Sequence, residues 1–311
     1  MYHRLEMWMR EIGRGLSTQT ARIGASPYLR LIRLPNLLTA PGDPLAGALW
    51  AGGGLGEAVS AMLAAVCLYA GALALNDACD EANDRYEHPG RPIPRGLVSP
   101  GGARRVAIGL FAIGIGLAAL GGWACGAIAA ILTATAVAYN LRLKHSPLGP
   151  WAMGACRGQS VLMGAACIEA PGGPALGVVI VAVGMTAYTV ALTALAAQET
   201  RRERIEQRRW APSLAALANG CMGLLIGFGL GRVFGGLLGI LAAWRAVEPA
   251  ERWNLASPPR RRAFTGTLVS NIPLLQAAWI CAVGGRAAVG GLCWALFAPL
   301  HRRWSRRAGT D

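Results

Sequence analysis

The chain has 311 residues, of which 54% are hydrophobic and only 15% are charged. Soluble domains carry roughly 25% charged residues, so this composition excludes an ordinary soluble globular protein and indicates membrane-spanning helices. The formal net charge of +14 raises the question of nucleic-acid binding. The basic residues gather in short segments between apolar runs, as they do in the cytoplasmic loops of membrane proteins, so no nucleic-acid partner is expected.

Apolar runs follow one another along the chain, which predicts an all-α, polytopic transmembrane helical bundle of nine to ten spans around a central cavity. The runs lie near residues 31–51, 57–77, 104–122, 124–140, 150–169, 174–197, 211–229, 232–247, 264–284 and 286–301. If all of them span, only Arg232 and Arg286 fall on the side opposite the other basic residues, so both chain ends are predicted to be cytoplasmic. We expect an amphipathic cytoplasmic arm over 1–26, a membrane domain over 27–303 and a basic cytoplasmic tail over 304–311.

The first apolar run contains three polar residues of interest. Arg33 lies near the edge of the run and is interpreted as an arginine whose charged head extends to the membrane interface. A side chain that faces the central cavity is the alternative. Asn36 lies inside the run, where a polar side chain usually faces protein or a cavity. Asp43 lies in the sequence PGDP, which predicts irregular backbone, and a packing, cavity or catalytic role stays open for it.

The second run ends in a concentration of acidic residues, LALNDACDEANDRYEHPGRPIPRG over residues 73–96. Asp77, Asp80 and Asp84 have offsets of 0, 3 and 7, so they share one helix face if the helix continues through them, and Asn76 joins through Asp80. Such a cluster needs a counter-charge, and Mg²⁺ takes oxygen ligands from one or two carboxylates and a substrate phosphate. The alternative is a hydrated acidic loop or neutralisation by nearby arginines, namely Arg85, Arg91 and Arg95.

The pattern Asn76-Asp77-x-x-Asp80-x-x-x-Asp84, followed by Arg91-Pro92-Ile93-Pro94-x-Gly96, resembles the first aspartate motif of the UbiA family of intramembrane prenyltransferases. In that family the motif binds Mg²⁺ and, through it, the diphosphate of an isoprenoid substrate. The three prolines after His88 exclude a helix and predict a loop. The resemblance implies that this loop caps the active site, with the guanidinium of Arg91 placed to meet diphosphate oxygens.

A short basic segment between the fourth and fifth runs resembles the family's tyrosine-containing loop, whose cations neutralise the leaving diphosphate. Its residues are Tyr139, Asn140, Arg142 and Lys144. An ordinary positive-inside loop is the alternative. The resemblance also implies that Asn36 and Asn76 belong to the substrate-binding surface.

Arg157 lies inside the fifth run, and burying its charge costs several kcal/mol unless it is paired or reaches water. A substrate oxygen or a glutamate of the next motif is the expected partner, so Arg157 is included among the substrate-binding candidates. The sequence around it, MGACRG over 153–158, resembles that of a UbiA-like subgroup called EboC.

The sixth run is followed by Glu199 and Glu203, one helical turn apart. The family places a second aspartate motif, DxxxD, at this point, and glutamates also ligate Mg²⁺. The alternative is an exposed glutamate pair among arginines, whose ion pairs contribute little to stability. The change from aspartate leaves the second metal site, the substrate and the activity open.

The resemblance implies a Mg²⁺-dependent prenyltransferase of the cell (inner) membrane with its active site facing the cytoplasm. It would transfer an isoprenoid group from a prenyl diphosphate to a small aromatic or lipophilic acceptor. The predicted metal-binding and catalytic residues are Asp77, Asp80, Asp84, Glu199 and Glu203. Two alternatives stay open, a relative that binds a prenyl lipid without turnover and a membrane transporter or cation-binding protein.

The eight cysteines show no CxxC pair and are predicted to be free core residues. The four histidines are too dispersed in sequence to indicate a zinc site.

Overall fold

The computed structural model describes residues 26–169, 175–197, 210–252 and 258–301, and every regular element in these ranges is helical. The elements are α2 (Pro27–Leu31), α3 (Leu34–Leu37), α4 (Gly42–Trp50), α5 (Leu55–Cys79), α6 (Glu81–Glu87), α7 (Pro100–Leu120), α8 (Trp123–Ala138), the π-helical turn η1 (Tyr139–Leu143), α9 (Gly149–Ala165), α10 (Ala175–Ala196), α12 (Ala211–Ile226), α13 (Gly231–Arg252), α14 (Pro258–Ser270), α15 (Ile272–Ala282) and α16 (Gly285–Ala295). The predicted all-α class is confirmed. Apart from Ser26, the predicted arm lies outside the described residues, as does the tail over 304–311.

Four of the described helices are long and apolar enough to cross a membrane, namely α5, α7, α8 together with η1, and α10. The helix α12 is apolar but shorter. Two predicted runs are divided, 31–51 into α2, α3 and α4, and 264–284 into α14 and α15. Pro273 explains the second break, because proline lacks an N–H donor and is accepted in the first turn of a helix. The number of spans, nine or ten, stays a prediction.

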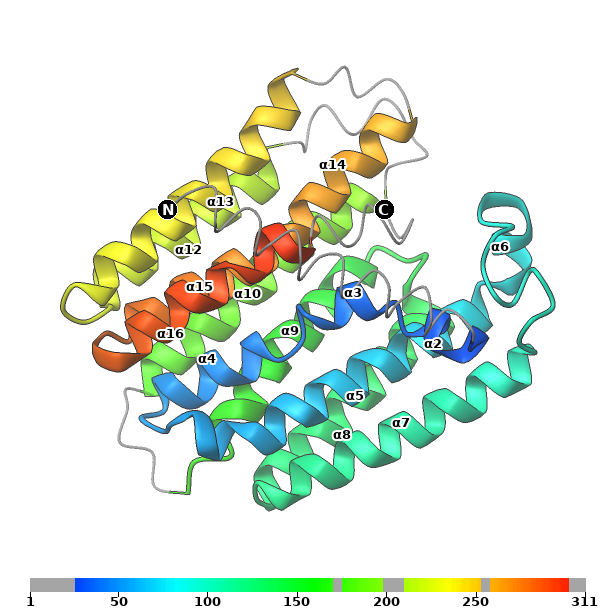
Figure 1. The fold of residues 1–311 in the computed structure, drawn as a ribbon, viewed down its shortest axis with the longest axis horizontal. Helices are drawn as coiled ribbons and strands as arrows, with labels where there is room; N and C mark the ends of the chain where they lie inside the picture. Colours follow the sequence, from blue (N-terminus) through cyan, green and yellow to red (C-terminus); the bar gives the residue numbers. More distant parts are fainter. Residues whose placement is uncertain (1–25, 170–174, 198–209, 253–257, 302–311) are drawn as a thin grey trace, which may run out of the picture.

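The helices run side by side as a bundle (Figure 1). In its first half, α5 packs against α7, and α9 packs against α4 and α8. In its second half, α13 packs against α12 and α15, while α10 contacts both α9 and α12 and joins the halves. One buried apolar cluster includes Leu68, Phe111 and Met163, and the other includes Tyr188 and Trp279. The bundle therefore has two cores that meet at α9.

Glycines allow α4 and α9 to cross closely. A Cβ atom on Gly47 would lie 1.9 Å from the carbonyl oxygen of Val161, and one on Gly164 would lie 1.9 Å from the carbonyl oxygen of Pro44. Small residues at helix crossings are typical of membrane bundles, where van der Waals packing stabilises helix association. This crossing matters for the site, because α4 carries Asp43 and α9 carries Arg157.

Replacing Gly164 with Ala is expected to destabilise the protein by about 1–3 kcal/mol, because the added methyl group forces α4 away from α9. Gly116→Ala in α7 is the matched control, since a Cβ atom there meets nothing within 4 Å. Thermal unfolding in detergent micelles should show a lower Tm for Gly164→Ala and no decrease for Gly116→Ala. Equal Tm values for the two variants would contradict the close crossing.

Candidate active site

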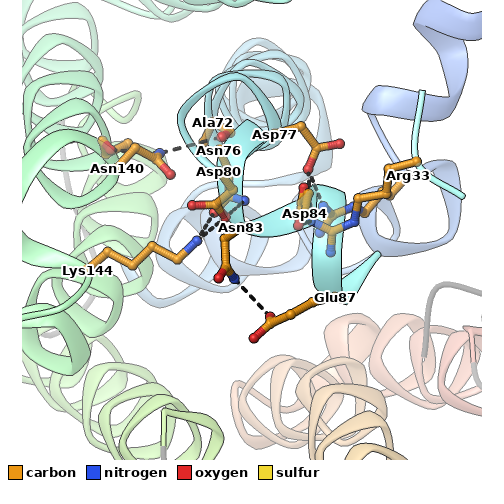
Figure 2. Close-up of polar contacts among 12 residues, drawn as sticks. Arg33, Ala72, Asn76, Asp77, Asp80, Asn83, Asp84, Glu87, Asn140 and Lys144 are labelled. Carbon is orange, nitrogen blue, oxygen red and sulfur yellow. Dashed lines mark hydrogen bonds and ion pairs between the residues drawn. The ribbon is translucent and has the colours of Figure 1, made fainter. Parts of the chain in front are cut away.

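The acidic segment is bent at Asp80. The helix α5 ends at Cys79, Asp80 has φ −89° and ψ 4°, and α6 begins at Glu81. The condition for a shared face, a helix that continues through all three aspartates, is therefore not met. Asp77 and Asp84 face Arg33, while Asp80 lies toward Lys144 (Figure 2). Like charges on one face would repel, and the bend lets the carboxylates reach cations on two sides instead.

Asp77 and Asp84 form the buried half of the acidic motif, each only 2% exposed. The Nη1 atom of Arg91 lies 2.6 Å from both carboxylate oxygens of Asp84 and 3.6 Å from Oδ1 of Asp77. Arg33 donates a hydrogen bond to Asp77 from the turn between α2 and α3. The predicted loop over 88–96 thus reaches the motif through Arg91, and Ile93 anchors the loop in the apolar core.

Arg33 points inward to Asp77 and lines the cavity described below, so the interfacial interpretation is wrong and the alternative, a side chain that faces the cavity, is confirmed. Its backbone has a φ of 44°, a left-handed conformation that costs free energy in a non-glycine residue and is maintained by surrounding contacts. The sequence contained a signal for this inward orientation, because Arg33 closely precedes the Pro35-Asn36 pair in the first run.

Asp80 forms a second polar group with Asn76 and Lys144. Lys144 Nζ contacts the carboxylate of Asp80 and donates to Oδ1 of Asn76 at 3.1 Å, and Asn76 Nδ2 donates to Asp80 at 2.8 Å. The predicted link between Asn76 and Asp80 is confirmed. Lys144 follows η1, and π-helical turns of this kind often occur at functional sites. Asn140, also on η1, is buried and donates to the carbonyl oxygen of Ala136 at 2.9 Å.

The carboxylate oxygens of this motif and their negative charge fit the ligand preference of Mg²⁺. Three carboxylate oxygens of Asp77 and Asp84 converge on one positively charged nitrogen of Arg91, and Mg²⁺ is commonly held by one or two carboxylates with further oxygens from water and phosphate. Within the described ranges, no three His, Cys, Asp or Glu side chains gather closely enough to hold a metal ion on their own. Glu199 and Glu203 lie outside the described residues, so the second metal site stays a prediction.

A cavity of about 240 Å³ extends from the acidic motif into the bundle. It follows one face of α5 from Ala65 to Asn76, a distance of about 16 Å along the helix axis. Its walls between the polar groups are mostly apolar, with Leu68, Leu73 and Leu132 among them. Arg33, Asn76, Tyr139 and Asn140 line it near the motif, and Asp43, Tyr69, Arg157 and Ser160 line it farther along α5 and α9. The shape and lining suit a ligand with an anionic head and an apolar tail.

Arg157 belongs to a buried polar cluster deep in the bundle. Its Nη1 atom donates to Oδ2 of Asp43 at 2.6 Å, and its Nη2 atom donates to Oγ1 of Thr39 at 2.9 Å. Gln276 Nε2 donates to the other oxygen of Asp43 at 2.8 Å, and Trp294 Nε1 donates to Gln276 at 3.1 Å. Asp43 was not among the partners expected for Arg157. The sequence did contain a signal for this pair: Asp43 and Arg157 are isolated opposite charges in two apolar runs, and intramembrane charges usually pair.

Two of the described candidate residues neither contact the acidic motif nor line this cavity. Arg142 is exposed on η1. Asn36 is partly buried on α3, where its backbone oxygen accepts a hydrogen bond from Thr39 at 2.8 Å, and it is not among the residues that line the cavity. Their predicted roles in substrate binding stay predictions. The structure places Arg33 and Asp43, whose roles the sequence left open, in the wall of the cavity, and it adds Gln276 as a hydrogen-bond partner of Asp43.

The sequence is similar to curated proteins over part of its length. It is 40% identical over 146 residues to digeranylgeranylglyceryl phosphate synthase from Methanopyrus kandleri, covering 46% of this chain and 54% of the relative. It is 37% identical over 147 residues to the enzyme of the same name from Methanoculleus marisnigri, covering 46% of this chain and 52% of the relative. The chain thus spans about half the length of the curated relatives it matches.

The fold is similar to that of a UbiA homologue from Archaeoglobus fulgidus bound to GPP and Mg²⁺. The TM-score is 0.62 at 15% sequence identity, and the match covers 83% of this chain and 99% of the other. At this identity the likeness concerns the fold, and the narrower resemblance to EboC stays a prediction. The model of the UbiA prenyltransferase family matches residues 44–272. The match covers well over half of the chain and includes the acidic motif, the basic turn and Arg157, and the chain therefore belongs to the UbiA prenyltransferase family.

Proposed function

We propose that this protein is a membrane prenyltransferase that transfers an isoprenoid group from a prenyl diphosphate to a lipophilic acceptor, with Mg²⁺-assisted loss of diphosphate. The observation that carries the proposal is the convergence of Asp77 and Asp84 on one cationic nitrogen beside a largely apolar cavity. Such a site offers ligands for a metal-bound diphosphate at one end and space for an apolar chain at the other.

The residues around the motif neutralise the leaving group. A bound Mg²⁺ would be held by Asp77 and Asp84 and would supply Lewis-acid stabilisation of the diphosphate. Arg33, Arg91 and Lys144 lie beside the carboxylates and offer charged N–H donors to the diphosphate oxygens as the C–O bond breaks. The electron pair of that bond leaves with the diphosphate, so these donors act where negative charge develops.

The cavity protects the allylic cation that remains after the diphosphate leaves. Its apolar walls limit access of water, which would otherwise hydrolyse the reactive centre. The aromatic ring of Tyr139 lines the cavity and is able to stabilise a cation. The ring of Tyr69 also lines the cavity, and the guanidinium of Arg157 lies over it, 5.6 Å from its centroid. The acceptor then forms the new bond with the allylic carbon and loses a proton.

The acceptor and the orientation in the membrane are part of the proposal. The curated relatives are named for a product with two geranylgeranyl groups on glyceryl phosphate, so a glyceryl phosphate with one such group is an acceptor to test beside aromatic acceptors. We place the site at the cytoplasmic face of the cell membrane, because Arg85, Arg91, Arg95 and Lys144 lie in segments adjoining the motif.

Turnover with a radiolabelled substrate tests the proposal. Purified protein incubated with geranylgeranyl diphosphate, Mg²⁺ and each candidate acceptor should release diphosphate and yield a prenylated product, and EDTA should abolish the reaction. Binding of the prenyl diphosphate without release of diphosphate by any acceptor would favour a lipid-binding relative. Absence of both binding and release would contradict a prenyl diphosphate site.

Lys144 is expected to matter more for turnover than Arg142, although the sequence placed both in the same basic turn. Lys144 contacts Asp80 and Asn76, whereas Arg142 is exposed. Lys144→Gln should lower kcat/KM by about 10- to 100-fold through loss of a cation that positions Asp80. Arg142→Gln should lower it less. Steady-state kinetics on the two variants checks this order, and the reverse order would refute it.

A further inference from the structure

Two cysteines that the proposed reaction does not use are in contact with each other. Cys125 lies in the first turn of α8, and Cys167 lies just beyond the C-terminus of α9. Their sulfur atoms are 2.9 Å apart, and the residues are 0% and 7% exposed. Both thiols are free in this structure. The two buried thiols, 42 positions apart in the sequence, are therefore in contact, and their sulfur atoms would need to approach by only about 0.9 Å to reach the length of a disulfide bond.

Neighbouring residues hold this contact in place. The Sγ atom of Cys167 lies 3.8 Å from the hydroxyl of Ser60 on α5 and donates to the carbonyl oxygen of Met163 at 3.5 Å. A Cβ atom on Gly121 would lie 2.6 Å from the same sulfur. A side chain at Gly121, in the turn between α7 and α8, would therefore displace the sulfur of Cys167. The contact is part of the packing among α5, α8 and α9.

The cysteine pair lies at the end of the bundle opposite the acidic motif. Cys125 precedes Tyr139 by 14 positions, which is about 21 Å along a helix. The α7–α8 turn lies at the opposite end of the bundle from α6 (Figure 1). No Lys or Arg occurs in residues 106–141 or 158–169, whereas the acidic motif adjoins basic segments. The positive-inside rule therefore assigns the cysteine end to the extracytoplasmic face, where disulfides form and persist.

We propose that Cys125 and Cys167 are oxidised to a disulfide that links α8 to α9 on the extracytoplasmic side. The oxidant would be a disulfide compound or a disulfide oxidoreductase. The Cys167 thiolate, the more exposed of the two, attacks the oxidant and displaces one of its thiols. Cys125 then attacks the sulfur of Cys167, the protein S–S bond forms, and the second thiol of the oxidant leaves. Two protein thiols are oxidised, and the oxidant disulfide is reduced to two thiols.

This link would fix two helices that line the cavity. Leu132 and Tyr139 on the α8–η1 segment and Met153 and Arg157 on α9 face the cavity, so the disulfide would hold the far ends of these walls together. A closed loop of this length also restricts the unfolded chain and so raises stability. The link does not depend on catalytic turnover, because none of the proposed substrate-binding residues takes part in it.

Thiol trapping and mass spectrometry test the proposal. Cells are lysed in N-ethylmaleimide and denaturant without reductant, and the protein is also purified and incubated with oxidised glutathione before the same treatment. In both samples a linked peptide pair containing Cys125 and Cys167 is expected, and reduction should release it. In the oxidised sample the Tm in detergent should be higher than after dithiothreitol treatment.

Single variants provide the controls. Cys125→Ser and Cys167→Ser should each abolish the linked peptide pair and the reductant-dependent shift in Tm. Cys67→Ser, which changes a partly buried cysteine on α5, should leave both unchanged. Complete alkylation of Cys125 and Cys167 in both wild-type samples would overturn the proposal. Linkage of either residue to a different cysteine would overturn it as well.

Discussion

Replacing Asp77 with Asn is expected to lower kcat/KM by about 100- to 1,000-fold, the loss typical when a charged group that stabilises the transition state is removed. Asp77 is nearly fully buried and shares a cationic contact with Asp84. The amide keeps the size of the side chain but removes the negative charge that would hold the Mg²⁺ ion. The same change also leaves Arg33 and Arg91 without one of their carboxylate partners.

A neighbouring acid provides the control for Asp77→Asn. Glu87 is exposed at the end of α6 and accepts a hydrogen bond from Asn83 at 2.9 Å. Glu87→Gln therefore makes the same chemical change on the same segment. Its kcat/KM should stay close to that of the wild type. Kinetics at saturating and limiting Mg²⁺ should show a weaker apparent Mg²⁺ affinity for Asp77→Asn only. If Asp77→Asn turned over substrate at the wild-type rate, the proposed role of the acidic motif in catalysis would be contradicted.

The second large effect is expected from the buried ion pair between Asp43 and Arg157. Asp43→Ala should destabilise the protein by about 3–5 kcal/mol, because Arg157 keeps its charge in a buried site without its carboxylate partner. Gln276 would lose an acceptor at the same time. Thermal unfolding in detergent micelles should therefore show a strongly reduced Tm.

Two further variants separate the loss of pairing from a general effect of the substitution. Arg85→Ala breaks an exposed pair with Glu81 on α6 and should change stability by less than about 1 kcal/mol. Combining Asp43→Ala with Arg157→Met removes both charges and should recover part of the lost Tm. If Asp43→Ala unfolds no earlier than Arg85→Ala, Asp43 and Arg157 are not a buried pair.

The sequence predicted the features that depend on local spacing. The offset between Asn76 and Asp80 is one helical turn, and the two side chains are hydrogen-bonded. The prolines after His88 produced the loop that carries Arg91, since proline restricts the backbone wherever it occurs. The apolar runs predicted the helices, because within a membrane each helix must satisfy its backbone hydrogen bonds locally.

Features that depend on long-range contacts could not be read from the sequence. The bend at Asp80 places its carboxylate beside Lys144, a residue 64 positions away. Gln276 reaches Asp43 across 233 positions, and nothing in the local sequence of the run 264–284 singled it out. Arg33 was interpreted as interfacial because the charged head of an arginine near the edge of an apolar run usually extends to the membrane interface. Only the folded chain brings it to Asp77.

The most direct test of the proposed diphosphate site is an experimental structure of the protein with a prenyl diphosphate and Mn²⁺, which replaces Mg²⁺ and gives an anomalous signal. We predict a peak coordinated by oxygens of Asp77 or Asp84 and by the diphosphate, with Arg91 turned from Asp84 toward the phosphates. A diphosphate and metal bound away from both aspartates would contradict the account.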